Sequence, residues 1–273
     1  MSFEFFTDDG YRRAFDHFGG IRKRIAEIMH ELCAGPADMI LDIPSGHGYF
    51  AAEIASSFAS CRCLGVGLPS DVYSHFRLRG SDVYPREVWS RIEYLCCDAV
   101  QLSLADSSFD LVVNFLGLED IKMTRGEEGV VQALSEMVRV LKADGLLQIS
   151  ISEYGDLPEE RVAREAWSAT GLNVEFAPRD WYVEALEGLE MKVTREEVLT
   201  FPKKMTVHQA KEELRFACEE APKTFASFGV TAVSFKDVWS EFGDLIAKHG
   251  MAYWSRIRVI ILKKAQCLHH VLL

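Results

Sequence analysis

One short stretch of the chain, residues 38–55, places a buried strand, a glycine turn and the start of a helix in direct succession. Apolar residues dominate positions 39–43, Gly46 and Gly48 follow within five residues, and apolar residues return at helical spacing from Phe50 onward. Glycine lets the backbone turn sharply and lets a ligand approach the unpaired amide groups at the helix start. The stretch therefore predicts a strand-to-helix turn that binds a nucleotide-like or acidic small molecule.

This turn fits two ligand-binding patterns, and Asp42 distinguishes between them. Residues 46–51 match the GxGxxA form of the dinucleotide fingerprint. However, an acidic residue at the end of the strand would repel a pyrophosphate, whereas it suits a ligand that carries ammonium and sulfonium charges. With Asp42, the stretch resembles motif I (LDxGxGxG) of the class I S-adenosylmethionine-dependent methyltransferases, with Pro44 in place of the first glycine. A strand-to-helix turn that binds no ligand is the alternative.

Composition and charge narrow the classes of partner. The chain has 273 residues, is 48% hydrophobic and carries a formal net charge of −11, which argues against a nucleic-acid partner because such proteins need a basic face. No apolar run is long enough for a membrane span, no signal-peptide pattern is present, and the seven cysteines fit a reducing compartment, so we expect a cytoplasmic protein. Cys61 and Cys63 open one predicted strand, whereas Cys96 and Cys97 close its neighbour. No metal site is therefore predicted.

The resemblance implies a site residue at the end of each following strand. The second strand, 61–71, has Gly67 where relatives carry an acid that binds both ribose hydroxyls. Loss of such a bond costs roughly 1.5–3 kcal/mol. Asp71 is the nearest replacement. The third strand ends at Asp98, whose carboxylate is expected to accept a hydrogen bond from the adenine amino group; the alternative role is a loop cap.

The strand at 109–121 ends where ligands sit in doubly wound sheets. The resemblance places Asn114 and Phe115 beside the methionine end of the cofactor. Glu119 and Asp120 follow and are weak candidates for a general base, although exposed acids on a loop are more often simply solvated. The complete set of residues predicted to bind S-adenosylmethionine is Asp42, Ser45, Gly46, Gly48, Gly67, Leu68, Asp98, Ala99, Asn114 and Phe115.

The resemblance also implies the architecture. We expect an α/β fold, a seven-stranded doubly wound Rossmann-like sheet in the order 3-2-1-4-5-7-6, formed by a single domain over residues 1–273. Residues 36–152 form the predicted cofactor-binding core. Residues 1–35 form a predicted N-terminal helical lid, in which Gly19–Gly20 interrupts the helix and Tyr11, Phe15 and Phe18 are lid candidates.

Between the last two predicted strands lie about fifty residues where a tight hairpin would suffice. Thr206-x-x-Gln209 is a capping box that begins one helix, and Ser234 begins another. We predict a helical cap formed by residues 153–188 and 202–254, which encloses the substrate. Four aromatic residues in or beside this insertion are candidates for substrate contact or for the insertion's own core: Phe201, Trp239, Tyr253 and Trp254.

Three functions remain open from the residues. The first is methyl transfer from S-adenosylmethionine to a small, partly apolar metabolite, as in the quinone-biosynthesis-like branch of the resembled family. The second is a catalytically degenerate binding protein, which Pro44 and Gly67 motivate. The third, methylation of a protein or tRNA, is disfavoured by the acidic balance. For methyl transfer no fixed catalytic triad is expected, because the methyl group is already activated and positioning achieves much of the rate.

Overall fold

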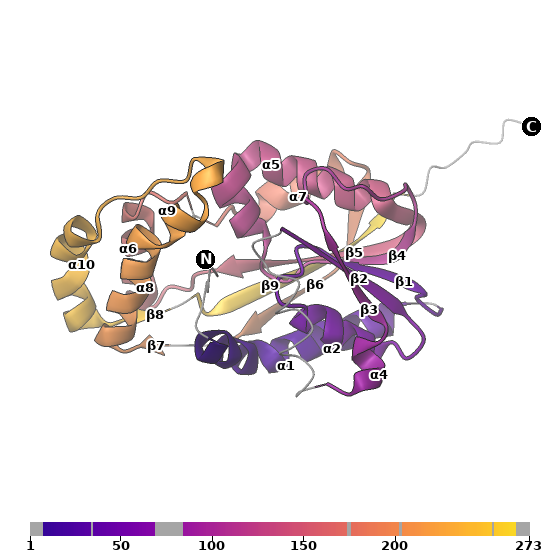
Figure 1. Cartoon of the computed structure of the whole chain (residues 1–273), viewed down its shortest axis with the longest axis horizontal. Helices are drawn as coiled ribbons and strands as arrows, with labels where there is room; N and C mark the ends of the chain where they lie inside the picture. Colours follow the sequence, from indigo (N-terminus) through magenta and orange to yellow (C-terminus); the bar gives the residue numbers. More distant parts are fainter. Residues whose placement is uncertain are drawn as a thin grey trace, which may run out of the picture.

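The computed structural model describes residues 8–33, 35–68, 84–173, 176–201, 204–252 and 254–265, with side chains from residue 19 onward (Figure 1). The side chains of the predicted lid residues Tyr11, Phe15 and Phe18 lie outside this described part. The same is true of Asp71, the candidate replacement for the missing ribose acid, and of Tyr253.

A seven-stranded sheet in the order β3-β2-β1-β4-β5-β9-β6 forms the centre of the molecule, which confirms the predicted strand order with β9 as the seventh strand. β1 to β5 are parallel, and β9 runs antiparallel to both β5 and β6. The strands are β1 (Met39–Asp42), β2 (Arg62–Gly67), β3 (Ile92–Cys96), β4 (Phe109–Val113), β5 (Leu141–Glu153), β6 (Met191–Thr200) and β9 (Arg256–Lys264). Cys61 and Cys63 lie near the start of β2, whereas Cys96 pairs with Gly67 at its far end, so the two cysteine pairs are at opposite ends of the sheet.

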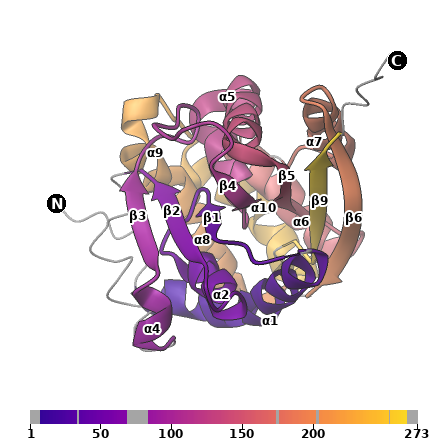
Figure 2. The ribbon, with the colours of Figure 1, turned by 90° about the vertical axis from the view of Figure 1, so that its right-hand side faces the viewer.

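Helices cover both faces of the sheet, each over its own apolar core (Figure 2). One face carries α1 (Asp8–Leu32), α2 (Tyr49–Ser57) and α4 (Arg86–Trp89), and the other carries α5 (Leu118–Val140) and α7 (Arg179–Glu187). The strands between them are apolar on both sides, as parallel strands buried on two faces require.

Two helices differ from the prediction. α1 continues through Gly19 and Gly20 without interruption, because Ile21, Ile25 and Ile28 bury one continuous stripe against the sheet face and the packing outweighs the poor helix propensity of glycine. α5 begins at Leu118, inside the stretch 109–121 that was predicted as a strand and its exit, and it is kinked at Gly126, whose φ of 69° and ψ of −172° are non-helical.

β5 presents a polar row that is fully buried. Gln148, Ser150 and Ser152 are all at most 2% exposed. The Gln148 amide donates to the Asn114 carbonyl (3.1 Å) and to Ser150 Oγ (2.7 Å), so burial leaves these groups hydrogen-bonded. Gln148 and Ser150 are therefore buried at little cost, because their polar groups bond within the sheet.

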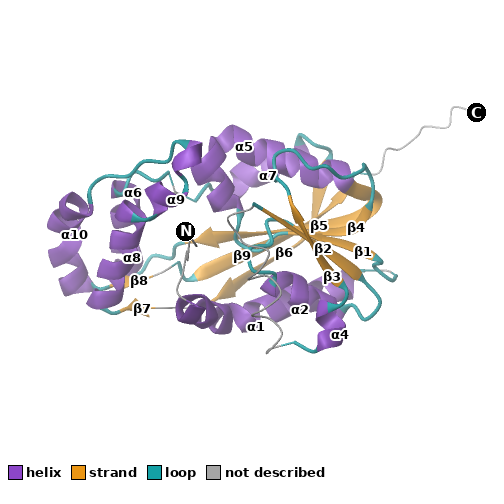
Figure 3. Cartoon of the chain, viewed as in Figure 1, coloured by secondary structure: helices purple, strands orange, loops and turns teal. Residues whose placement is uncertain are grey.

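A separate group of helices lies at one end of the sheet (Figures 1 and 3). We call this group the cap. It contains α6 (Pro158–Ala169), α8 (Val207–Glu219), α9 (Ala221–Thr224), η2 (Ala226–Phe228) and α10 (Phe235–His249), with a small hairpin of β7 (Lys204–Met205) and β8 (Met251–Ala252). Both predicted helix N-terminal capping residues form their hydrogen bonds: Gln209 N donates to Thr206 Oγ1 (3.2 Å), and Asp237 N donates to Ser234 Oγ (3.2 Å).

The cap has its own apolar core, in which Phe242, Ile246 and Leu214 are buried and Trp239 packs at the edge. Trp239 therefore belongs to the core of the insertion, which was one of its two predicted roles. α7 lies inside the range predicted for the cap, but it packs on the sheet beside α5 through Tyr182 and Leu186. The range 153–188 thus contributes only α6 to the cap.

Glu160 holds two of the chain segments that connect the cap to the sheet. The Glu160 side chain is buried, and its Oε1 accepts hydrogen bonds from Gly155 N (2.8 Å) and Ser255 N (2.9 Å). Gly155 follows β5 and Ser255 precedes β9, so one carboxylate anchors both the first entry of the chain into the cap and its last exit from it.

Candidate functional site

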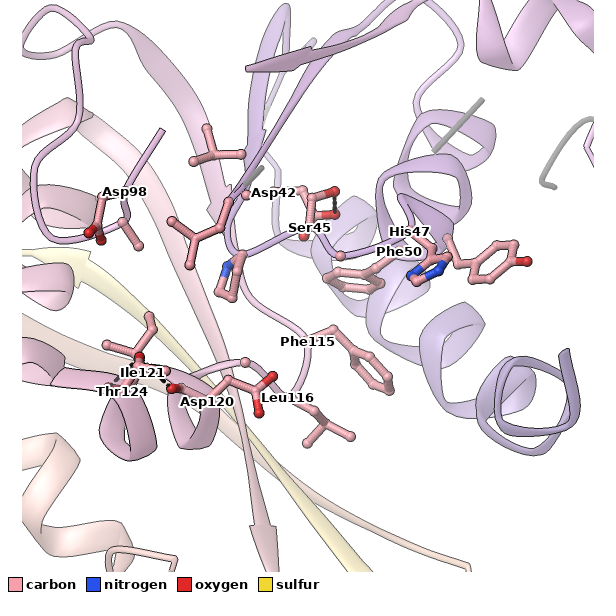
Figure 4. Close-up of a pocket in the computed structure, with 18 of the residues that line it drawn as sticks. Asp42, Ser45, His47, Phe50, Asp98, Phe115, Leu116, Asp120, Ile121 and Thr124 are labelled. Atoms are coloured by element: carbon pink, nitrogen blue, oxygen red, sulfur yellow. Dashed lines mark hydrogen bonds between the residues drawn. The ribbon is translucent and has the colours of Figure 1, made fainter. Parts of the chain in front are cut away.

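A pocket with a cavity volume of about 430 Å³ opens where β1, β2, β3 and β4 end, and the cap contributes to its wall. Loops at the carboxyl ends of parallel strands form binding sites in doubly wound sheets. Figure 4 shows Asp42 and Ser45 on one wall, Asp98 on a second wall, and Phe115, Leu116 and Asp120 across from them. We call this space the main pocket.

Asp42 ends β1 and is buried at the base of the main pocket, with 1% of its surface exposed. Ser45 Oγ donates a 2.6 Å hydrogen bond to Asp42 Oδ2, whereas Oδ1 has no hydrogen-bond partner among the described residues. Burial raises the pKa of Asp42 to about 7, whereas the bond from Ser45 and the backbone N–H of Ala51 act in the opposite direction. The base of the pocket therefore holds a carboxylate with one unsatisfied oxygen.

The turn after β1 depends on glycine at two positions. Gly46 has a φ of 49° and Gly48 a φ of 78°, both in the left-handed region that other residues rarely adopt. Gly46 lines the main pocket, but Gly48 does not; it forms the N-cap of α2. Gly48 thus shapes the turn rather than forming part of the pocket surface.

The second and third strands supply the opposite end of the pocket. Gly67 and Leu68 line it at the end of β2, and Asp98 and Ala99 line it just after β3. Asp98 Oδ1 accepts a hydrogen bond from Val100 N (3.2 Å), so this carboxylate also caps its own loop. Among the described lining residues, no acid comes from the end of β2.

Asn114 and Phe115 differ in their placement. Phe115 lines the main pocket and lies 5.3 Å from the Phe50 ring, centroid to centroid. Asn114 is fully buried behind the wall, where its Nδ2 donates to the Ile43 carbonyl (2.8 Å). Asn114 therefore joins the ends of β1 and β4 and does not line the pocket.

Glu119 and Asp120, the two candidate bases, point to different places. Asp120 lines the main pocket and points into it (Figure 4). Glu119 does not line it. Instead, Glu119 Oε1 accepts a hydrogen bond from Ser152 N (3.3 Å), and burial raises the pKa of this carboxyl. The structure thus brings only Asp120 into the pocket.

Several lining residues were not predicted from the sequence. Arg22 on α1 is 3% exposed, and burial lowers the pKa of its guanidinium. Its spacing within an apolar helical stripe was the signal that could have indicated an inward-facing cation. Phe225 of the cap and Trp254, which precedes β9, line the other side. Trp254 was among the four aromatic candidates, whereas Phe201 packs in the sheet core.

Residues 41–149 match the family model described as a methyltransferase domain. These residues form a methyltransferase domain. The match begins within β1 and ends within β5, so it contains the strand ends that form the main pocket. The resemblance and the seven-stranded Rossmann-like fold predicted from the sequence are both confirmed.

Two curated relatives of the methyltransferase domain have named activities. The malonyl-[acyl-carrier protein] O-methyltransferase of Nitrosospira multiformis is 26% identical over 175 residues, which cover 56% of this chain and 54% of that protein. The demethylmenaquinone methyltransferase of Clavibacter sepedonicus is 31% identical over 127 residues, which cover 46% of this chain and 45% of that protein. The chain spans about half the length of these relatives.

Among solved structures, geranyl diphosphate methyltransferase in complex with SAM has the same fold, with a TM-score of 0.53 and 11% identity. The superposition covers 95% of this chain and 92% of that chain, so the shared fold extends beyond the methyltransferase domain. Within the described residues, no helix is both long enough and apolar enough to span a membrane.

Proposed function

We propose that this protein transfers a methyl group from S-adenosylmethionine to a small, partly apolar metabolite. The observation that carries the proposal is the pair of carboxylates, Asp42 and Asp98, at opposite ends of one pocket formed by the tips of neighbouring strands. A zwitterionic nucleoside needs an acceptor for its ammonium group at one end and an acceptor for its adenine amino group at the other. The family match and the ligand of the related solved structure support the choice of cofactor.

The residues present fit this cofactor. Asp42 Oδ1 is a buried acceptor without a partner among the described residues, which is what a cationic N–H donor would satisfy. When bound, S-adenosylmethionine supplies a methyl group activated by the sulfonium charge. Asp42 would hold the ammonium group, and Arg22, the buried cation in the same pocket, would hold the carboxylate. Asp98 and the backbone of Ala99 would hold the adenine.

The acceptor would occupy the side of the main pocket that is lined by apolar residues. Phe115, Leu116 and Phe225 line this side, and Trp254 extends it through a ring contact with Phe176 at 5.5 Å between centroids. Apolar walls exclude water and hold an acceptor against the reacting carbon. Asp120 is the acid in this part of the pocket, so we assign to it the removal of a proton from the acceptor where the reaction requires one.

The relatives suggest two acceptor classes to test. One relative is named for a malonyl thioester on a carrier protein and another for a demethylated menaquinone. A quinol ring suits the apolar walls. A carboxylate acceptor would need a cation on its side of the pocket, whereas the lining arginine Arg125 is paired with Asp98. The aromatic walls favour the quinol class.

Calorimetric titration with S-adenosylmethionine and S-adenosylhomocysteine tests the proposal. We expect both to bind, and we expect Asp98→Ala to weaken binding by tenfold or more. Val100→Ala, in which the backbone N–H that Asp98 caps is retained, is the matched control and should bind normally. If neither ligand bound at millimolar concentration, the degenerate, non-catalytic alternative that Pro44 and Gly67 motivate would replace the enzyme.

A further inference from the structure

Arg125 contacts both the sheet and the cap beside the main pocket. Its guanidinium donates a hydrogen bond to Asp98 Oδ2, and its Cζ lies 4.5 Å from the centre of the Phe228 ring in η2. Arg125 also lines the pocket together with Asp98 and Phe225. One side chain therefore joins the third strand to the cap at the end of the pocket that we assign to adenine.

Two glycines of α5 place Arg125 in this position. Gly126 has a φ of 69° and a ψ of −172°, a backbone conformation that is essentially restricted to glycine, and it separates residues 118–125 from the rest of the helix. Gly129 is also required, because a Cβ atom at this position would lie 2.1 Å from Arg125 Cβ. The kinked helix thus directs Arg125 toward Asp98 instead of along the helix axis.

Both carboxylate oxygens of Asp98 accept a hydrogen bond in this structure. Oδ1 accepts from Val100 N, and Oδ2 accepts from Arg125. The exocyclic amino group of adenine is also an N–H donor, so it offers the carboxylate the same kind of bond that the guanidinium makes. Asp98 and Arg125 are both partly exposed, at 29% and 38% of their side-chain surface, and ion pairs of this kind are weak enough for a ligand to displace.

We propose that Arg125 occupies Asp98 in place of the adenine amino group and that nucleoside binding exchanges the two donors. This inference rests on the proposed function, because it assigns adenine to Asp98. It makes Arg125 a residue that sets the affinity of the adenine end. Once displaced from Asp98, Arg125 keeps its contact with Phe228, so occupancy of the adenine end changes the link between sheet and cap.

The cap element that Arg125 touches also contacts the first segment of α5 by other means. Phe225 lines the pocket and packs in one cluster with Met123, Ala217 and Ala221. This cluster holds α8, α9 and Phe225, the residue that precedes η2, against Met123 of α5 independently of the ion pair. The cap therefore stays in place when Arg125 leaves Asp98, and the exchange alters its attachment without opening the fold.

Titration of S-adenosylhomocysteine into Arg125→Met and Arg125→Lys variants tests the exchange. Methionine keeps the aliphatic contact with Phe228 but has no donor for Asp98, so we expect Arg125→Met to bind three- to tenfold more tightly than the natural protein. Lysine retains a donor and should bind within twofold of it. Arg161→Ala, which removes an exposed arginine of α6 outside the pocket lining, should leave the affinity unchanged.

A double-mutant cycle separates exchange from a merely structural effect. In the Asp98→Ala background, Arg125→Met should no longer change the affinity, because the group for which the two donors compete is absent. Equal or weaker binding by Arg125→Met in the natural background would overturn the exchange. Absence of binding by the natural protein would instead overturn the proposed function, so the two failures are distinguishable.

Discussion

Ser45 donates a 2.6 Å hydrogen bond to one carboxylate oxygen of Asp42 and leaves the other oxygen without a partner among the described residues. Burial outweighs this bond and raises the pKa of Asp42 to about 7, so the carboxyl is largely protonated in the ligand-free protein below neutral pH. An ammonium group requires the ionised form. The buried carboxyl is therefore a titrating group whose charge depends on the ligand.

The affinity for S-adenosylhomocysteine should depend on pH through this group. Below about pH 7 a proton must leave Asp42 before the ammonium group binds. The dissociation constant should therefore increase by about tenfold for each unit by which the pH falls below 7, and it should be constant above pH 7. Calorimetry between pH 5.5 and 8.5 measures this. Ser45→Ala removes the bond that lowers the pKa and should move the bend upward, while Asp42→Asn should bind weakly at every pH. A flat profile for the natural protein would contradict the assignment.

The stability of the ligand-free protein should change with pH in the opposite sense. The folded pKa of about 7 is above the ordinary value of 3.8, so between these values the folded state binds more protons than the unfolded state, and stability falls as pH rises. Above pH 7 Asp42 is ionised in the folded protein, so the full free-energy cost of burying its charge reduces the stability. Asp42→Asn should therefore stabilise the ligand-free protein at pH 8 by up to about 4 kcal/mol, the free energy that corresponds to a pKa difference of about three units. At pH 3.5 it should have little effect, which urea unfolding at the two pH values would reveal.

The joint between cap and sheet should depend on Glu160. Alanine at this position would leave the N–H groups of Gly155 and Ser255 without their acceptor, and we expect a loss of about 2–5 kcal/mol in the free energy of unfolding. Glutamine keeps an acceptor oxygen, so Glu160→Gln should lose less. Glu165→Ala, an exposed position on the same helix, is the matched control and should change stability by less than about 0.5 kcal/mol in denaturant unfolding.

Two glycines in helices should respond to alanine with opposite signs. Gly20 lies on the exposed face of α1, and a Cβ atom added there would have no other atom within 4 Å. Gly20→Ala should therefore stabilise the protein by about 0.5–1 kcal/mol. Gly126 also has open space around it, but its φ is 69°, so Gly126→Ala should destabilise the protein by about 1–3 kcal/mol. Thermal unfolding of both variants distinguishes backbone strain from crowding, because crowding is absent at both positions.

The sequence predicted those features that depend on local pattern. The strand order was implied by the family resemblance that the motifs carry, and Thr206 and Ser234 cap the predicted helices because a cap needs only residues within one turn. What it missed depends on packing between distant segments. Arg22 lines the pocket because α1 lies against the sheet, and Arg125 meets Asp98 and Phe228 only because α5 is kinked and the cap lies alongside.

The same distinction explains the candidate residues that changed role. Asn114 and Glu119 lie close in sequence to pocket residues, yet both are bonded to neighbouring strand ends through Ile43 and Ser152. Adjacent residues at a strand end or in a first helical turn point in different directions. The sequence alone gave no means of choosing between Glu119 and Asp120, because that choice depends on which of them faces the main pocket.

Asp120 and Glu119 should therefore differ in their effects on turnover. Asp120→Asn keeps the shape of the side chain but removes the base, so we expect turnover with an acceptor that must lose a proton to fall by about 10²- to 10⁴-fold. The dissociation constant of S-adenosylhomocysteine should stay within about twofold, since Asp120 is assigned to the acceptor. Glu119→Gln should instead leave turnover unchanged, because Glu119 is bonded to Ser152 N outside the pocket lining. Equal loss of turnover in both variants would show that the effect arises from a disturbed α5 and would remove Asp120 from its assigned role.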